Sequence, residues 1–233
     1  MSRVIIIAGG SGKRWAEHLS KPKHLIPVLD EPIIHRTCRL LHELTPIRDV
    51  LISSTNPDYL AYDAQLAEPR GYENTRGGAK KFLDNRYLWN EEGRTIVLYG
   101  DVFFTEDAIR TITEYDKDEW QLFCRFGGSG LTGTPWGECF AQSFLPKHHQ
   151  QHFTNLLYVS ALYAEGRIAR CGGWEHYRAM NGKDGEDVLA LTTPAANLGK
   201  ATEINDWTDD FDWPADYQRF IERYWKAHTR CPS

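Results

Sequence analysis

Residues 5–15 and 21–28 combine the pattern of a buried strand, a glycine-rich turn and a cluster of cationic side chains. The β-branched run ends in three glycines within four positions, at Gly9, Gly10 and Gly12. Glycine lets backbone N–H groups come close to phosphate oxygens, and nearby cations neutralise phosphate charge. The pattern therefore predicts a loop that holds a polyphosphate. The cationic residues in and after this turn are Lys13, Arg14, Lys21 and Lys23.

Two common phosphate-binding loops do not fit this segment. A Walker loop needs Ser or Thr after Lys13, where the chain has Arg14, and it needs glycine where Ile7 stands. A dinucleotide-binding fingerprint in this register would need glycine where Trp15 stands. The loop therefore belongs to another class of phosphate site.

A candidate metal ligand follows a second buried strand, predicted over residues 95–99. The strand ends in Gly100-Asp101. Open α/β sheets bind ligands at the carboxyl ends of their parallel strands, and carboxylate oxygens are suitable ligands for Mg²⁺. Asp101 is therefore the first candidate ligand for Mg²⁺. The alternative is that Asp101 caps the helix predicted to begin near Thr105.

An acidic segment near the end of the sequence offers further carboxylates. Residues 206–216 hold five aspartates in eleven positions and no cationic residue, and a final helix is predicted from Pro214. The alternative to metal binding is that these aspartates face water or favour the dipole of that helix. The five are Asp206, Asp209, Asp210, Asp212 and Asp216.

Three motifs together resemble the nucleotidyltransferases with a GT-A-like fold, which include sugar-phosphate, phosphocholine and molybdenum-cofactor members. They are Gly-Gly-x-Gly-x-Arg at residues 9–14 with a downstream Pro22-Lys23, Gly-Asp at 100–101, and Asp-x-Pro-x-Asp at 212–216. The resemblance implies an α/β fold with three layers and a Rossmann-like, mostly parallel central sheet. It also implies transfer of a nucleoside monophosphate from an NTP to a sugar phosphate or alcohol phosphate, with release of pyrophosphate, as in nucleotide-sugar biosynthesis.

The resemblance also implies roles for individual residues. Asp101 and Asp212 would hold Mg²⁺, with Asp206, Asp209 and Asp210 as competitors for the second position, and Arg14 and Lys23 would act on the phosphates. Family frequency favours CTP or UTP. Gly77 and Gly78 have an alternative role, which is only to begin a helix. The residues that would contact the nucleotide are Ala8, Gly9, Gly10, Ser11, Gly12, Lys13, Arg14, Ser53, Gly77, Gly78 and Ala79.

Two other functions remain open from the residues. A GT-A glycosyltransferase is expected to have Asp-x-Asp after the central strand, where this chain has Asp101-Val102-Phe103. The chain carries Asp-x-Asp elsewhere, at 116–118 and 210–212. A nucleotide-binding regulatory module would keep the loop without needing both Asp101 and Asp212. One departure from the sugar-phosphate members is His24, where they commonly have proline after the lysine. This departure favours the compact members of the superfamily.

Strand and helix signals alternate as a parallel α/β sheet requires. We expect one domain over 1–233, with a nucleotide-binding half at 1–120 and an acceptor-binding half at 121–233 that the final helix closes. Strands are predicted at 3–8, 50–53, 95–99, 120–126 and 140–144, and helices at 33–44, from about 79 to 89, from 105, at 150–164 and from 214.

Composition narrows the partners and the compartment. The formal net charge of −5 gives no basic field that would attract nucleic acid. Five scattered cysteines without CxxC spacing argue against a zinc site or a disulfide framework. We find no long apolar span, so we expect a cytoplasmic protein without membrane contact. Lys147, His148, His149 and His152 are interpreted as a solvated or phosphate-facing patch, because no companion ligand stands at zinc spacing.

Overall fold

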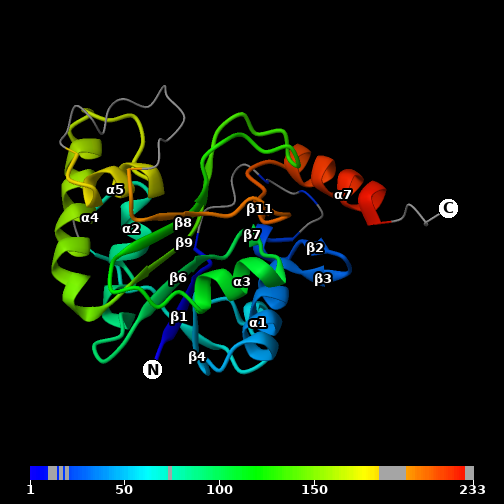
Figure 1. Ribbon diagram of the computed structural model, residues 1–233, viewed down its shortest axis with the longest axis horizontal. Coiled ribbons are helices and arrows are strands. Elements are labelled where there is room, and N and C mark those ends of the chain that lie inside the picture. Colours follow the sequence, from blue (N-terminus) through cyan, green and yellow to red (C-terminus); the bar gives the residue numbers. More distant parts are fainter. Residues whose placement is uncertain (10–14, 16–17, 19–20, 73–74, 184–197, 229–233) are drawn as a thin grey trace.

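A mostly parallel β-sheet forms the centre of the molecule (Figure 1). The structure is a computed structural model that describes residues 1–9, 15, 18, 21–72, 75–183 and 198–228. Within these residues, seven strands form the main sheet in the order β10-β8-β9-β6-β1-β4-β5. The strands are β1 (Arg3–Ile7), β4 (Asp49–Ser53), β5 (Gln65–Ala67), β6 (Thr95–Tyr99), β8 (Gln121–Arg125), β9 (Glu138–Phe144) and β10 (Ala201–Glu203).

The direction of the strands decides which residues share the carboxyl edge of the sheet. Strands β6, β1, β4 and β5 run parallel, whereas β9 runs antiparallel between β6 and β8. Because β9 is antiparallel, its first residue, Glu138, lies at the edge where β6 and β8 end, opposite Arg125. The predicted fold class is confirmed, with β9 as the antiparallel member.

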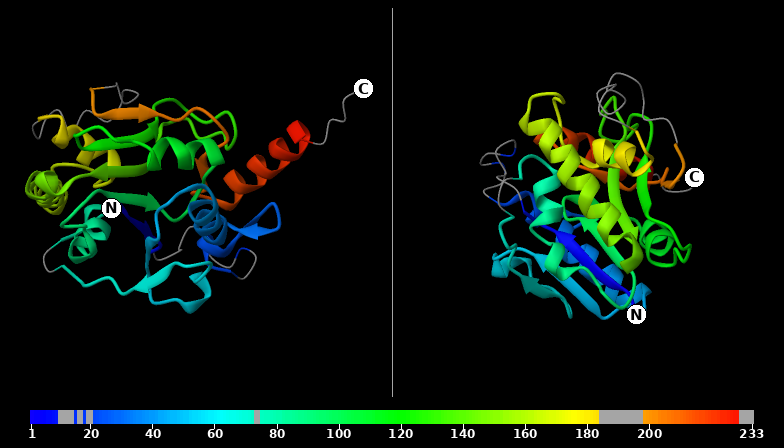
Figure 2. Two further views of the ribbon diagram at one scale, coloured as in Figure 1. Left: turned by 60° about the horizontal axis from the view of Figure 1, so that its bottom comes forward. Right: turned by 90° about the vertical axis from the view of Figure 1, so that its left-hand side faces the viewer.

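Helices cover both faces of the sheet and complete three layers (Figures 1 and 2). Helices α1 (Ile33–Leu44) and α3 (Glu106–Thr113) pack on one face, and α2 (Ala79–Leu83), α4 (His149–Ala164) and α5 (Gly173–Met180) pack on the other. The buried side of α1 follows helical periodicity, with Ile33, Ile34, Thr37, Leu40 and Leu41 inside. Each face of the sheet carries an apolar core, and packing against that core stabilises these helices at their positions.

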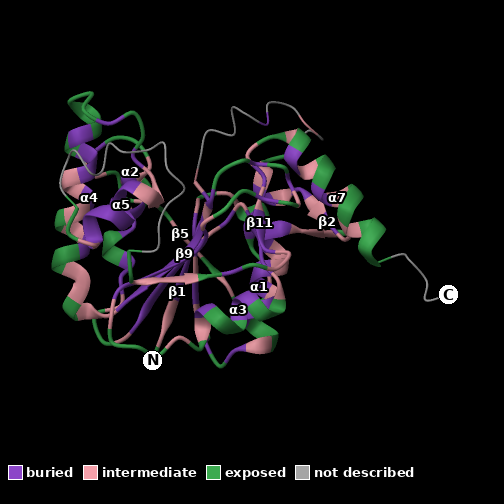
Figure 3. Cartoon of the chain, turned by 45° about the horizontal axis from the view of Figure 1, so that its top comes forward, coloured by how far each residue is buried: buried purple, intermediate pink, exposed green. Residues whose placement is uncertain are grey.

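A third apolar cluster fixes the end of the chain against the carboxyl edge of the sheet. Strand β7 (Val102–Phe103) pairs antiparallel with β11 (Asp209–Asp210), so that Asp210 lies opposite Val102. Helix α7 (Pro214–His228) follows and points away from the sheet (Figure 1), with Phe220 fully buried beside Phe211. Figure 3 shows the central strands as buried and much of α7 as exposed. This arrangement brings the acidic segment next to Asp101.

Short elements connect these layers. They are the hairpin β2 (Pro27–Val28) and β3 (Glu31–Pro32) and the 3₁₀ helices η2 (Lys23–Leu25), η3 (Pro57–Tyr59), η4 (Arg86–Leu88) and η5 (Pro146–His148).

The predicted strands at 3–8, 50–53, 95–99, 120–126 and 140–144 and the helices at 33–44, from 105, at 150–164 and from 214 are found within a few residues. The helix expected to reach residue 89 instead ends at Leu83. The next residue, Asp84, accepts hydrogen bonds from Tyr72 N at 2.7 Å and Lys80 Nζ at 2.8 Å, and it joins the helix end to the preceding loop. Helix α5 and the short strands β5, β7, β10 and β11 were not predicted, because none has a long periodic pattern.

The interpretation of residues 147–152 as a solvated patch is wrong for His152. Its ring is fully buried, and its Nδ1 accepts a hydrogen bond from Trp120 Nε1 at 3.1 Å. His152 lies on the inner side of α4 with Leu156 and Val159, three and four residues apart, so helical geometry places it in the core. Lys147, in contrast, is exposed and pairs with Asp118.

Two further observations concern compartment and membrane. The described cysteines Cys38, Cys124, Cys139 and Cys171 are buried free thiols. In the part of the chain that the structure describes, we find no helix with the length and apolar character needed to span a bilayer.

Candidate active site

Lys23, near the beginning of the chain, forms ion pairs with both predicted metal ligands, Asp101 and Asp212. Its Nζ lies 3.1 Å from Asp101 Oδ2 and 3.8 Å from Asp212 Oδ1. The side chain is 10% exposed, and burial alone would lower its pKa. The carboxylates of Asp101, Asp210 and Asp212 outweigh burial and raise the pKa of Lys23. The ammonium therefore stays charged among these carboxylates.

Asp101 lies directly beyond the end of β6. Burial acts to raise its pKa, but the charge of Lys23 and the hydrogen bond from it hold the pKa of Asp101 well below its usual range. Asp101 is thus an ionised oxygen donor at the carboxyl edge of the sheet. It does not cap α3, since Thr105 is the N-cap of that helix and its hydroxyl accepts from Ala108 N at 3.0 Å.

The structure separates the five aspartates of the acidic segment by their partners. Asp209 is fully buried, pairs with Arg125 Nη2 at 3.0 Å and accepts hydrogen bonds from Ser129 and Thr132. Asp206 accepts from Thr105 Oγ1 and, at 2.7 Å, from Thr208 N. These two carboxylates are engaged in holding loops together.

The remaining three aspartates divide between the helix start and the site. Asp216 accepts from Trp213 N at 2.8 Å and pairs with Arg219 at 3.0 Å at the start of α7. Asp212 lies beside Lys23, and Asp210 faces the same group of charges. Burial and the charges of Asp101 and Asp212 raise the pKa of Asp210. Its Oδ1 is buried with no hydrogen-bond partner among the described residues.

The donor chemistry fits a divalent cation with a preference for oxygen. Asp101 and Asp212 carry two negative charges beside the one ammonium group of Lys23, and Asp210 adds a buried oxygen, Oδ1, that has no hydrogen-bond partner among the described residues. No group of three His, Cys, Asp or Glu residues in the described segments is arranged to hold a metal by itself. Mg²⁺ usually takes one or two carboxylates together with substrate phosphates, so two of these aspartates are sufficient.

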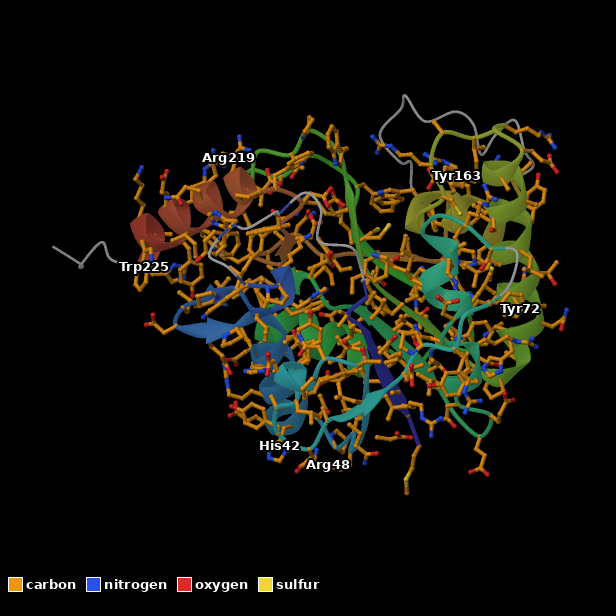
Figure 4. The ribbon with its side chains drawn as sticks, turned by 180° about the vertical axis from the view of Figure 1, so that it is seen from behind. His42, Arg48, Tyr72, Tyr163, Arg219 and Trp225 are labelled. Atoms are coloured by element: carbon orange, nitrogen blue, oxygen red, sulfur yellow. The ribbon has the colours of Figure 1, made fainter. Side chains whose placement is uncertain are left out.

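A cavity of about 810 Å³ opens beside this cluster. Gly9, His24, Asp101 and Asp210 line it, together with residues of the 126–139 and 163–178 regions. A volume of this size is in the range of pockets that bind small ligands and cofactors. Figure 4 shows Tyr163, which lines the cavity, near the end of α4 on the side opposite α7.

His24 is part of the cavity wall. Its Nδ1 lies 3.2 Å from Tyr59 Oη, and burial lowers the pKa of His24 to about 4. The imidazole is therefore neutral near pH 7 and adds no charge between Lys23 and the cavity. The residue that departs from the sugar-phosphate pattern thus forms part of the site itself.

The predicted nucleotide-binding residues are only partly within the described chain. Gly10, Ser11, Gly12, Lys13 and Arg14 lie outside the described residues. Ala8 is buried after β1, and Gly9 lines the cavity.

The glycine turn before α2 has both a packing role and a place at the cavity. Gly77 and Gly78 line the cavity, whereas Ser53 and Ala79 are buried and are not among its described lining residues. A Cβ atom at Gly78 would lie 2.2 Å from the carbonyl oxygen of Cys171, so glycine is required for the close contact between α2 and the 171–173 segment.

The sequence-based prediction missed several residues that line the cavity. Glu138, at the start of β9 next to β6, lines the cavity, and burial together with the negative charges of Asp210 and Asp212 raises the pKa of that carboxyl. Arg178 also lines it, from a helix that was not predicted. The Gly127-Gly128 and Gly172-Gly173 pairs were the available signal, because such pairs often mark close backbone approach around a ligand.

A scan against family models gave a match over residues 4–162 to the MobA-like NTP transferase domain. This chain belongs to that family. The match includes Lys23 and Asp101, and it ends before Arg178 and Asp212.

The MobA-like domain also resembles individual known proteins. This chain is 30% identical over 114 residues to a 2-C-methyl-D-erythritol 4-phosphate cytidylyltransferase of Saccharopolyspora erythraea. The aligned region covers 48% of this chain and 50% of that protein. The chain thus spans half the length of this curated relative.

Solved structures share the fold across the whole chain. A CTP:phosphocholine cytidylyltransferase from Streptococcus pneumoniae has a TM-score of 0.57 and 15% identity, with 96% of this chain and 99% of that chain covered. A UDP-glucose pyrophosphorylase from Acinetobacter baumanii has a TM-score of 0.55 and 12% identity, with 99% and 95% covered. At this identity the likeness concerns the fold.

Proposed function

We propose that this protein is a Mg²⁺-dependent nucleotidyltransferase that transfers a nucleoside monophosphate from an NTP to a small phosphorylated acceptor and releases pyrophosphate. Membership of the MobA-like NTP transferase family supports the reaction class. The observation that carries the proposal is the position of the Lys23 ammonium between Asp101 and Asp212 beside a large cavity. A curated relative named as a cytidylyltransferase supports a pyrimidine triphosphate, CTP or UTP.

In the proposed reaction, a phosphate oxygen of the acceptor attacks the α-phosphorus of the NTP in line. A new oxygen–phosphorus bond forms while the bond from the α-phosphorus to the bridging oxygen breaks, and pyrophosphate leaves with the electron pair. The attacking phosphate oxygen is already ionised, so no nucleophilic side chain or general base is required. The work of the chain is to position the reactants and stabilise charge.

The residues at the site divide this work. Asp101 and Asp212 would hold Mg²⁺, with Asp210 beside them, and the bound ion would neutralise charge on the α-phosphate and the acceptor. Lys23 would neutralise the same oxygens from the other side. The 9–12 backbone amides with Lys13 and Arg14 would stabilise the departing β- and γ-phosphates. Ala8, Ser53, Gly77, Gly78 and Ala79 would border the rest of the nucleotide.

The direct test is pyrophosphate release from each of the four NTPs with a panel of sugar and alcohol phosphates, with Mg²⁺ and with EDTA. We expect release that needs both a pyrimidine triphosphate and Mg²⁺, and its loss in the Asp101→Asn variant. Absence of pyrophosphate with every combination would contradict the proposal.

A glycosyltransferase is the second candidate, because the Asp210-x-Asp212 pair lies at the site next to Asp101. Such an enzyme would consume a nucleotide sugar and release a nucleoside diphosphate. Assaying the same preparation with nucleotide sugars separates the two reactions by their products. A regulatory module would instead bind an NTP tightly and give neither product.

Binding can be measured independently of turnover by thermal unfolding with each NTP. A ligand at a hundredfold excess over its dissociation constant stabilises the native state by about 2.7 kcal/mol. We expect CTP or UTP with Mg²⁺ to raise the unfolding temperature most. Equal stabilisation by all four NTPs would indicate that the base is not recognised.

A further inference from the structure

The cavity lining contains a buried guanidinium group, one of whose nitrogens has no hydrogen-bond partner among the described residues. Arg178 is 9% exposed and lines the cavity, and its Nη1 has no hydrogen-bond partner among the described residues. Its nearest acid is Glu175, whose Oε1 lies 3.9 Å from Nη1, too far for a hydrogen bond. The other oxygen of Glu175 accepts from Gly172 N at 2.7 Å. The buried Nη1 thus has Glu175 as a distant ion-pair partner but no hydrogen-bond acceptor, which an anionic ligand would supply.

Arg178 is anchored close to the reaction site but on a separate element from Lys23. A Cβ atom at Gly173, the first residue of α5, would lie 2.7 Å from Tyr99 Oη, so the start of α5 packs directly on the end of β6. Tyr99 comes two residues before Asp101. Arg178 lies five residues further along α5 from Gly173, which is a rise of about 7.5 Å. Because Asp101 and Arg178 line the same cavity, one acceptor can contact both.

The cavity lining carries charges of both signs: Glu138 and Glu175 are acidic, and Lys81 and Arg170 are basic. Lys81 and Arg170 line the cavity on exposed positions, and the Arg170 guanidinium lies 5.7 Å from the centre of the Trp136 ring. A quaternary ammonium ligand would need an open aromatic face of this kind. Because the Arg170 guanidinium lies over the Trp136 ring, that ring is less available to a cationic acceptor such as a choline phosphate.

On the basis of the proposed function, we propose that the acceptor is a phosphate monoester whose body carries a second anionic group, which Arg178 binds. The second group is a carboxylate or a second phosphate, both of which match the planar donors of a guanidinium. The reacting phosphate lies with Lys23, Asp101 and Asp212. The acceptor thus contacts two cationic groups on separate elements.

The test uses acceptors that differ in the second group. Glucuronic acid 1-phosphate is compared with glucose 1-phosphate, 3-phosphoglycerate with glycerol 3-phosphate, and phosphocholine serves as the cationic acceptor. Two readouts are taken, pyrophosphate release and thermal stabilisation of the full chain by each acceptor with Mg²⁺ and a non-hydrolysable NTP analogue. Sugar bisphosphates against the corresponding monophosphates separate a second phosphate from a carboxylate.

In wild-type protein, we expect an acceptor with a second anionic group to have a lower KM than the matched acceptor without that group. We also expect it to raise the unfolding temperature of the protein more. Arg178→Gln should raise KM for that acceptor about 10- to 100-fold, as for a lost hydrogen bond to a charged group, with a much smaller effect on kcat. Arg178→Lys should restore part of the affinity. Neutral acceptors should respond little to either variant.

Arg219→Gln is the matched control. Arg219 pairs with Asp216 three residues earlier, as Arg178 does with Glu175, but it lies on α7, away from Tyr163 (Figure 4), and is not among the described residues that line the cavity. Its kinetics should match the wild type. The unfolding temperature of each variant shows whether the fold is intact.

Three results would overturn the inference: equal KM values for neutral and anionic acceptors, preference for phosphocholine, or an equal loss for both kinds in Arg178→Gln. An equal loss would assign Arg178 to the reacting phosphate. If no acceptor releases pyrophosphate, the proposed function fails. The stabilisation measurement then decides the inference by itself. The inference requires that an acceptor with a second anionic group raises the unfolding temperature more in wild type than in Arg178→Gln.

Discussion

At the scale of single residues, the site depends on how charge is balanced around Lys23. One ammonium group contacts or faces three carboxylates, from Asp101, Asp210 and Asp212, which come from two distant parts of the chain. The surplus of negative charge is what a divalent cation would neutralise. Asp209, although next to these residues, is neutralised by Arg125 and belongs to the supporting structure.

Removing the Lys23 ammonium should reduce turnover strongly. We expect Lys23→Ala to lower pyrophosphate release by roughly 10²–10³, as for other lost electrostatic donors at transition states. The kcat of purified protein at saturating Mg²⁺ measures this. Lys117→Ala, at an exposed site, is the control and should keep wild-type kcat. Turnover of Lys23→Ala close to wild type would remove Lys23 from the mechanism.

The buried carboxylate of Asp210 should cost stability when no metal is bound. Its pKa is raised in the folded protein by burial and neighbouring carboxylates, so the folded state holds its proton more tightly than the unfolded chain. The protonated Asp210 carboxyl therefore favours the folded state at acid pH, and this contribution to the free energy of unfolding is lost as pH rises. In EDTA we therefore expect Asp210→Asn to unfold at a higher temperature than wild type, by a margin that grows from pH 5 to pH 8.

Asp209→Asn provides the contrast for that experiment. It breaks a fully buried ion pair, so it should lower the unfolding temperature at every pH in the same range. If Asp210→Asn is less stable than wild type at pH 8 in EDTA, the account of charge crowding is wrong.

At the scale of elements, two sets of contacts assemble the candidate site: the β7–β11 pair and the packing of the 171–173 segment. The short pair β7–β11 carries Asp210 to the residues that follow Asp101, and Phe211 and Phe220 hold this pair under α7. On the other side, the 171–173 segment packs so closely on α2 and β6 that glycine is needed at positions 78 and 173. These contacts border the cavity.

A methyl group at position 78 should separate α2 from the 171–173 segment. Its Cβ would lie 2.2 Å from a backbone oxygen, and relief of such overpacking typically costs about 1–3 kcal/mol. We expect Gly78→Ala to lose about this much unfolding free energy and to raise KM for the NTP, measured by denaturation and steady-state kinetics. Gly71→Ala, where a Cβ meets nothing within 4 Å, should change neither. Equal behaviour of the two variants would contradict the packing role.

At the scale of the whole molecule, we expect stability in acid to depend on histidines in the core between the sheet and α4 and α5. His152 and His176 are both buried, with ring centres 4.6 Å apart. Burial lowers the pKa of His176 to about 3 and that of His152 well below its ordinary value. The unfolded chain binds protons at these positions more tightly than the folded protein does.

The stability of the protein should therefore fall as pH drops from about 6.5 toward 3. His176→Phe removes one of these groups, and its unfolding free energy should fall less steeply over this range than that of wild type. Urea denaturation at several pH values measures the slope. Parallel slopes for the two proteins would show that His176 does not contribute.

The sequence by itself determined the fold class and most of its longer elements, and it predicted three residues that the structure brings together in the candidate site. Buried-strand and helical periodicities predicted the first half of the sheet, and the motifs pointed to Lys23, Asp101 and Asp212. These features are local, or they follow from the rule that parallel strands present their carboxyl ends on one edge. The resemblance to nucleotidyltransferases came from the same motifs, and the family match confirms it.

The tertiary structure decided what depends on contacts between distant segments. The sequence left Asp206, Asp209 and Asp210 as competitors of Asp212, and only their partners separate Asp209 with Arg125 from Asp212 with Lys23. His152 lies in the core rather than in a solvated patch, because α4 turns that side toward the sheet. Arg178 reaches the cavity from an unpredicted helix. Burial and pairing of this kind arise from packing between elements, which no local pattern encodes.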